Sequence, residues 1–105
     1  MQSKLDRIEK QIQSIKEKLQ QIGEMRPGSL TRQYHFLSKD RKYPYYQISY
    51  TRDMKSHTGY LRKELVDDTK KQIKNYRIFK SLIKRWVDLA IQHAKIKIDI
   101  ANKKL

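Results

Sequence analysis

Apolar residues recur at alternating spacings of three and four over the first 24 positions, and nearly every position between them is polar or charged. This is the a/d pattern of a coiled-coil seam, so we predict a heptad helix over residues 1–24, with Ser3 as its N-cap. A lone helix of this length is marginal in water, so the seam must pack against the C-terminal helix or a second copy. The order of Leu and Ile favours an antiparallel pair or a higher assembly. We expect oligomerisation through the seam: Leu5, Ile8, Ile12, Ile15, Leu19 and Ile22.

A two-residue periodicity replaces the heptad over residues 26–62. Tyr46, Ile48 and Tyr50 fall on one face of an extended segment, and Tyr45 falls on the other. Residues 30–37 and 56–61 have the composition of neighbouring strands, with a charged loop at 38–42 and a turn at 52–55. These features predict a three-stranded antiparallel sheet.

The last segment lacks Gly and Pro and repeats apolar residues at helical spacing, which predicts one long helix over residues 63–104. Trp86 and Leu89 widen its apolar arc and indicate burial on more than one side. The whole chain, residues 1–105, is therefore expected to be a single α+β domain, with the sheet between the two helices and the long helix packed against both. The stripe expected to be buried includes Val66, Ile73, Tyr76, Phe79, Ile83, Val87, Ala90, Ile91, Ala94, Ile98 and Ala101.

The charge of the chain also indicates what kind of partner it binds. The chain carries 25 Lys and Arg against 11 Asp and Glu, a net charge of +14, and the heptad segment is nearly neutral. The excess therefore belongs to the sheet and the long helix. Such an excess favours an anionic partner, nucleic acid before a membrane surface. We expect no membrane binding, because the basic helix has no apolar face free of packing.

Tyrosines are interleaved with cationic residues in the sheet segment. Cations neutralise phosphates and aromatic rings stack on bases, although tyrosine is also common in strands that simply cover helices. Alternatively, the three-stranded ribbon would enter a major groove, where a two-stranded ribbon fits. A basic run on a helix is usually a solvated face, but no acidic residue lies between Asp68 and Asp88 to neutralise it. The expected nucleic-acid-binding residues are Arg26, Arg32, Arg41, Lys42, Tyr43, Tyr45, Arg52, Lys55, Arg62, Lys70, Lys71, Lys74, Arg77 and Lys84.

Several classes of function are disfavoured. The chain has no cysteine, so disulfides and thiolate metal sites are excluded. Its three histidines lack metal-binding spacing and its glycines stand singly, so we expect no metal, no cofactor and no enzyme activity. No apolar run reaches the length of a membrane span, and the first residues lack an apolar leader, so we expect a cytoplasmic protein.

Four segments carry a family resemblance: residues 25–34 (MRPGSLTRQY), 44–50 (PYYQISY), 60–65 and 73–77, which contains an Asn-Tyr pair. In this order they resemble an uncharacterised family of small bacterial and archaeal proteins. Members of that family carry a short cysteine cluster between the first two strands, which looks like a metal site. Residues 35–43 contain no cysteine here, so the resemblance implies an architecture without that site and without an established activity.

Together these features predict a non-catalytic, oligomeric protein that binds DNA or RNA. The alternative is a protein-interaction or scaffold module that assembles through its helices and has no nucleic-acid role.

Overall fold

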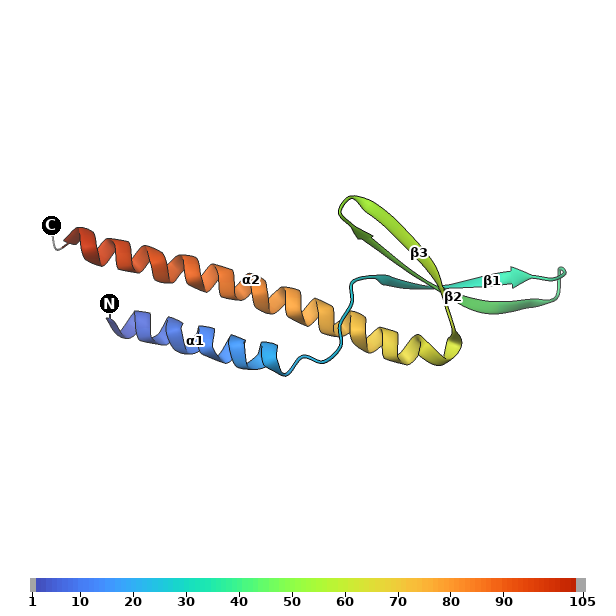
Figure 1. The fold of residues 1–105 in the computed structure, drawn as a ribbon, viewed down its shortest axis with the longest axis horizontal. Coiled ribbons are helices and arrows are strands. Elements are labelled where there is room, and N and C mark those ends of the chain that lie inside the picture. The colour runs from blue at the N-terminus through green and yellow to red at the C-terminus, as the bar shows by residue number, and fades with distance from the viewer. Residues whose placement is uncertain (1, 104–105) are drawn as a thin grey trace. The chain divides into compact units, whose positions relative to one another are not determined.

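The computed structural model describes residues 2–103, which form an α+β fold with a helix at each end and a sheet between them in the chain order, as predicted. The elements are α1 (Gln2–Gln20), β1 (Ser29–Phe36), β2 (Lys42–Arg52), β3 (Lys55–Leu61), a 3₁₀ turn (Lys63–Leu65) and α2 (Val66–Lys103) (Figure 1). The predicted last residue of the long helix, Lys104, lies outside the described residues.

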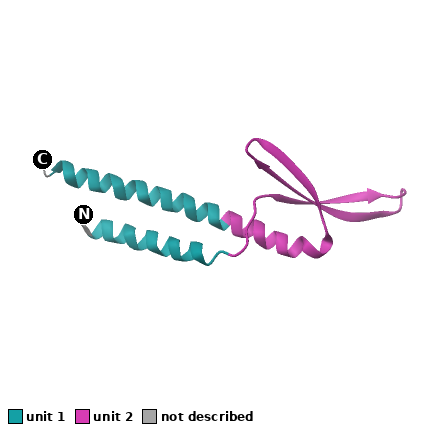
Figure 2. Cartoon of the chain, in the orientation of Figure 1, with its two compact units in different colours: residues 1–22, 78–105 teal, residues 23–77 magenta. Residues whose placement is uncertain are grey.

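The contacts divide the chain into two compact units (Figure 2). Residues 1–22 and 78–105 form the first, here called the helical unit, and residues 23–77 form the second, the sheet unit. Helix α2 contributes to both, because the boundary falls between Arg77 and Ile78.

The ends of α1 differ from the prediction. Helix α1 includes Gln2, so Ser3 lies within the helix and is not its N-cap. It ends at Gln20 rather than at residue 24. The amides of Gln21 and Ile22 donate to the carbonyls of Lys18 and Leu19, three residues back, which tightens the last turn and satisfies carbonyls that the helix leaves free.

In the helical unit, α1 lies alongside the C-terminal part of α2 and runs in the opposite direction (Figure 1). Ile8 and Ile15 of α1 form a core with Leu89 of α2, and Ile15 is only 2% exposed. The heptad seam therefore has a partner within the same chain, and the pairing is antiparallel. Partly buried side chains packed against this core are Ile12, Leu19, Leu82, Trp86 and Ile96.

The stripe predicted for the long helix is wrong in its second half. The side chains of α2 that pack against the core are Leu82, Trp86, Leu89 and Ile96. Val87, Ile91 and Ile98, which we expected to be buried, are exposed. Helix α2 carries two apolar rows here, and periodicity alone cannot say which of them α1 covers.

The sheet has the order β1-β2-β3 and is antiparallel throughout. β2 pairs with β1 over Lys42–Ser49 and with β3 over Tyr46–Arg52, so only the overlap, residues 46–49, has a neighbour on both sides. Beyond the overlap the sheet becomes two two-stranded arms: the β1–β2 arm (residues 33–45) and the β2–β3 arm (residues 50–57) (Figure 1). β2 is longer than the predicted strand, because its pairing with β1 continues to the Phe36–Lys42 pair.

One face of the sheet supplies its buried residues. Ile48 and Leu61 alternate onto this face and are buried, together with Val66 and Ile73 of α2. Leu30, on the same face, lines a hollow with Ile73, so we call this the helix-side face and the other the outer face. The segment before β1 is hydrogen-bonded to α2 as well.

Three hydrogen bonds join the segment before β1 to α2. The backbone amide of Arg26 donates to the carbonyl of Gln72 at 3.1 Å. The side-chain amide of Asn75 donates to the backbone carbonyl of Glu24 at 2.9 Å. The side-chain amide of Gln72 donates to the carboxylate of Glu24 at 3.0 Å. These bonds hold the chain in place where it enters the sheet.

Candidate nucleic-acid interface

The strands place the expected cations and the expected tyrosines on opposite faces of the sheet. The register puts Arg32, Lys42, Arg52 and Lys55 on the helix-side face with Ile48. Tyr43 and Tyr45 belong to the outer face, because strand side chains alternate. The structure therefore does not join these residues into one basic, tyrosine-rich surface.

Four aromatic rings form a row on the outer face. The His35 ring lies 5.4 Å from Tyr43 and 4.2 Å from Tyr45 between centroids, and Tyr45 lies 6.2 Å from Tyr60. The strand positions on this face carry no Lys, Arg, Asp or Glu. His35 and Tyr45 are close enough, with 23° between their planes, that each covers part of the other's face. The row therefore stabilises the β1–β2 arm by stacking across the strands.

Cations on the helix-side face are held by aromatic rings. The Arg32 guanidinium lies 5.3 Å and the Lys42 ammonium 4.7 Å from the Tyr34 ring. Arg26, in the segment before β1, is half-buried and lies 5.5 Å from the Tyr50 ring. A ring attracts a cation through its quadrupole but does not neutralise it. The positive charge of the exposed pair, Arg32 and Lys42, is therefore oriented and still available to an anion.

Both arms end in exposed apolar side chains that are not among the predicted binding residues. Phe36 and Leu37 are 73% and 67% exposed at the end of the β1–β2 arm, next to the loop that contains Arg41. That loop is closed by the Leu37 amide, which donates to the Arg41 carbonyl at 2.8 Å. Met54 is 99% exposed in the turn of the β2–β3 arm. The sequence contained one indication of this second exposed tip, because a methionine lies between Arg52 and Lys55 in a predicted turn.

The turn of the β2–β3 arm has an uncommon backbone. Asp53 and Met54 have φ values of 53° and 65°. Positive φ at both central residues is the geometry of a two-residue type I′ hairpin turn, which joins tightly twisted strands. The turn brings Arg52 and Lys55 together as a register pair at the end of the arm.

The first turns of α2 add cations to the sheet unit. Lys70, Lys74 and Arg77 line the hollow that also contains Leu30 and Ile73, and Lys71 is exposed on the same helix. Arg62 follows β3 and lines a second hollow with Tyr60. All the expected binding residues except Lys84 therefore lie in the sheet unit.

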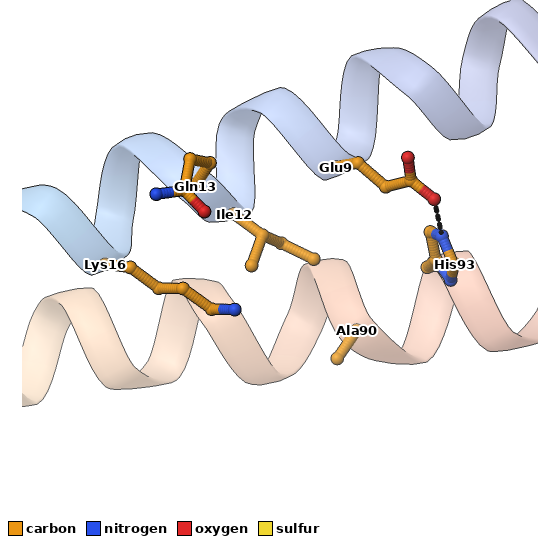
Figure 3. Close-up of a pocket in the computed structure, with 6 residues that line it drawn as sticks. All are labelled: Glu9, Ile12, Gln13, Lys16, Ala90 and His93. Atoms are coloured by element: carbon orange, nitrogen blue, oxygen red, sulfur yellow. Dashed lines mark hydrogen bonds and ion pairs between the residues drawn. The ribbon is translucent and has the colours of Figure 1, made fainter.

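Lys84 lies in the helical unit and is paired. Its ammonium is 3.1 Å from the carboxylate of Asp88. The expectation that no pairing within the helix could neutralise the basic run is therefore wrong for Lys84, because Asp88 lies one turn later on the same face. A hydrogen bond of 2.9 Å between Nε2 of His93 and the carboxylate of Glu9 joins α2 to α1 in the same unit (Figure 3).

The sheet unit contrasts with this pairing. It contains thirteen Lys and Arg and six Asp and Glu. None of these thirteen cations forms an ion pair with another described residue. No cation of the sheet unit is therefore neutralised by a direct ion pair with a described residue.

Two further findings bear on the site. No group of three or more His, Asp or Glu side chains within residues 2–103 is arranged to hold a metal ion. In the same range, neither helix combines the length and the apolar character needed to cross a bilayer.

Comparisons of the chain with models of known protein families, with curated proteins and with solved structures find no match. The family resemblance therefore stays a prediction.

Proposed function

We propose that this protein binds nucleic acid without catalysis, through its sheet unit. The observation that carries the proposal is the set of thirteen cations in residues 23–77, none of which has a carboxylate partner among the described residues. Neutralising phosphates and releasing their counterions is the main source of nucleic-acid affinity, and it requires cations that are not already paired. A cytoplasmic location accords with this role.

The arms favour duplex DNA as the ligand. The major groove of B-form DNA admits a two-stranded β-ribbon, whereas the major groove of an RNA helix is too narrow for protein side chains to read. Each arm carries cations beside an exposed apolar tip: Arg41 and Lys42 with Phe36, and Arg52 and Lys55 with Met54. Apolar side chains that enter a groove contact or separate base steps, while neighbouring cations hold the phosphates.

Binding of a generic DNA duplex, measured over a range of salt concentrations, tests the proposal. We expect the affinity to fall steeply with salt, with the slope of log K against log salt reduced by about 0.9 for each phosphate contact removed. The variant Arg41→Gln/Lys42→Gln/Arg52→Gln/Lys55→Gln should show a smaller slope and weaker binding. No binding of the unmodified chain at low salt would overturn the proposal.

A matched control separates the arms from the total charge. Lys4→Gln/Lys10→Gln/Lys18→Gln/Lys103→Gln removes the same formal charge from exposed helix positions. We expect this control to keep most of the salt slope. An equal loss in both variants would mean that the arms are not the binding surface.

The alternative function is a protein-interaction or scaffold module assembled through the helices. The exposed apolar residues of α2, Val87, Ile91 and Ile98, favour it. A chain that self-associates but binds neither duplex nor single-stranded oligonucleotides at low salt would support this alternative.

A further inference from the structure

Helix α2 has an apolar row that α1 does not cover. Val87, Ile91, Ala94, Ile98 and Ala101 are spaced four, three, four and three residues apart, a second heptad pattern on the helix. Val87, Ile91 and Ile98 are 51%, 61% and 60% exposed. We call these five residues the free row. Its N-terminal part borders a shallow groove lined by Ile83, Trp86, Val87, Ala90, Ile91 and Ala94.

The charges beside the free row are self-complementary. Asp88 follows Val87 and Lys95 follows Ala94, so the acid and the base occupy equivalent positions in successive heptads. In an antiparallel pair of heptad helices, these equivalent positions of the two helices face each other across the seam, and their charges set orientation and partner choice.

A second copy of the chain satisfies both features at once. When the free rows of two copies run antiparallel, with Val87 against Ile98 of the second copy, Ile91 lies against Ala94. Large side chains then meet small ones in the two central layers, which favours close packing, and Val87 meets Ile98 in the two outer layers. The same register brings Asp88 of each copy opposite Lys95 of the other, so the two-fold axis produces two identical ion pairs.

We propose that the free row is the interface of an antiparallel homodimer. The seam of α1 is not available for this role, because Ile8 and Ile15 are already buried against Leu89 of the same chain. The proposal is independent of nucleic-acid binding. It commits to a second copy because the charges flanking the row complement each other only when the row meets itself in reverse.

Charge reversal in the full chain tests the register. Asp88→Lys leaves lysine at both positions and Lys95→Asp leaves aspartate at both, so each variant alone places like charges opposite each other. Sedimentation at micromolar concentration should show a dimer of the unmodified chain, and each single variant should raise the dissociation constant by about tenfold or more. A mixture of the two variants should form a heterodimer, since each lysine then faces an aspartate.

Formation of the heterodimer distinguishes the antiparallel pairing from a parallel one. In a parallel pairing positions 88 and 95 would not meet, so mixing would not restore association. Asp88→Lys also removes the ion pair with Lys84 within the chain, but mixing two proteins cannot restore that pair. Lys10→Asp, a reversal at an exposed position of α1, is the matched control and should leave the dimer unchanged.

Ile91→Asp supplies a second, independent test. Because Ile91 is 61% exposed, the substitution does not disturb the core of the helical unit, and helix content by circular dichroism should be unchanged. We expect it to abolish the dimer. The proposal is overturned if the unmodified chain is monomeric at about 100 µM, well above the micromolar dissociation constants of weak specific complexes, or if mixing fails to restore association. A monomeric chain that binds anionic phospholipid vesicles through Ile91 would reassign the row to a membrane surface.

Discussion

Met54 adopts a left-handed backbone conformation that favours glycine, although its side chain is apolar and 99% exposed. The Met54 side chain is not buried within the chain and so contributes no burial free energy. Glycine would adopt this turn conformation at a lower cost in free energy. A residue kept in a sparsely populated conformation often serves a functional contact. Here the contact would be the apolar tip of the β2–β3 arm.

Met54→Gly should therefore separate stability from binding. We expect the free energy of unfolding to rise by about 0.5–1 kcal/mol, because the left-handed conformation no longer costs energy. Affinity for duplex DNA should fall about tenfold, since the side chain can no longer be buried in a groove. Denaturant unfolding and DNA titration measure the two effects. Asp53→Asn keeps Met54 and suits the same turn, so it should not weaken binding.

Gly28 is required by both its backbone and its surroundings. Its φ is 146°, and an added Cβ would lie 3.2 Å from Cγ1 of Ile48 and from the carbonyl oxygen of Ser49. Gly28→Ala should lower the free energy of unfolding by about 1–3 kcal/mol in a denaturant titration. A Cβ added at Gly59 would have no neighbouring atom within 4 Å. Gly59→Ala should therefore be neutral or slightly stabilising, and an equal loss at both positions would contradict this explanation.

At the scale of elements, two helices and three strands were predictable because their periodicities are local. The seam of α1 and the alternation of Tyr46, Ile48 and Tyr50 can be seen without knowing any long-range contact. When β2 is known to begin at Lys42, its alternation also places Tyr43 and Tyr45 on the face opposite to that of Lys42. That start was missed because it depends on pairing with Phe36 of β1. Element ends are decided by such partners more than by local preference.

Ile15→Ala tests the pairing of α1 with α2. Ile15 is 2% exposed, and its replacement leaves a cavity against Leu89, so we expect a loss of about 2–5 kcal/mol in the unfolding free energy. Leu37→Ala removes an exposed side chain from the β1–β2 loop and should cost less than about 1 kcal/mol. Loss of helical circular dichroism in urea measures both. If the two costs are similar, α1 is not packed as described.

At the scale of the whole molecule, the net charge of +14 is less informative than its distribution. In the helical unit Lys84 is paired with Asp88, whereas none of the thirteen cations of the sheet unit has a carboxylate partner among the described residues. A homodimer formed through the free row would carry two sheet units, so association and nucleic-acid binding become linked.

This linkage predicts an avidity effect that depends on ligand length. On a duplex long enough to meet both sheet units of a dimer, the second contact is effectively intramolecular, and overall affinity rises by about 10²-fold or more. Ile91→Asp should lose that gain and keep the affinity for a duplex that only one sheet unit can occupy. Titrations of the unmodified chain and the variant with short and long duplexes measure the difference. Equal affinity of both proteins for the long duplex would show that the two activities are not coupled.

The sequence by itself determined the kinds of elements, their order and the uneven placement of charge, because each of these depends on neighbouring residues. It also indicated burial on more than one side of the long helix through Trp86 and Leu89. Only the tertiary structure decided which apolar row of α2 meets α1 and how far each strand continues as a two-stranded arm. These properties depend on residues distant in the chain, and two rows of equal apolar character cannot be ranked until one of them is covered.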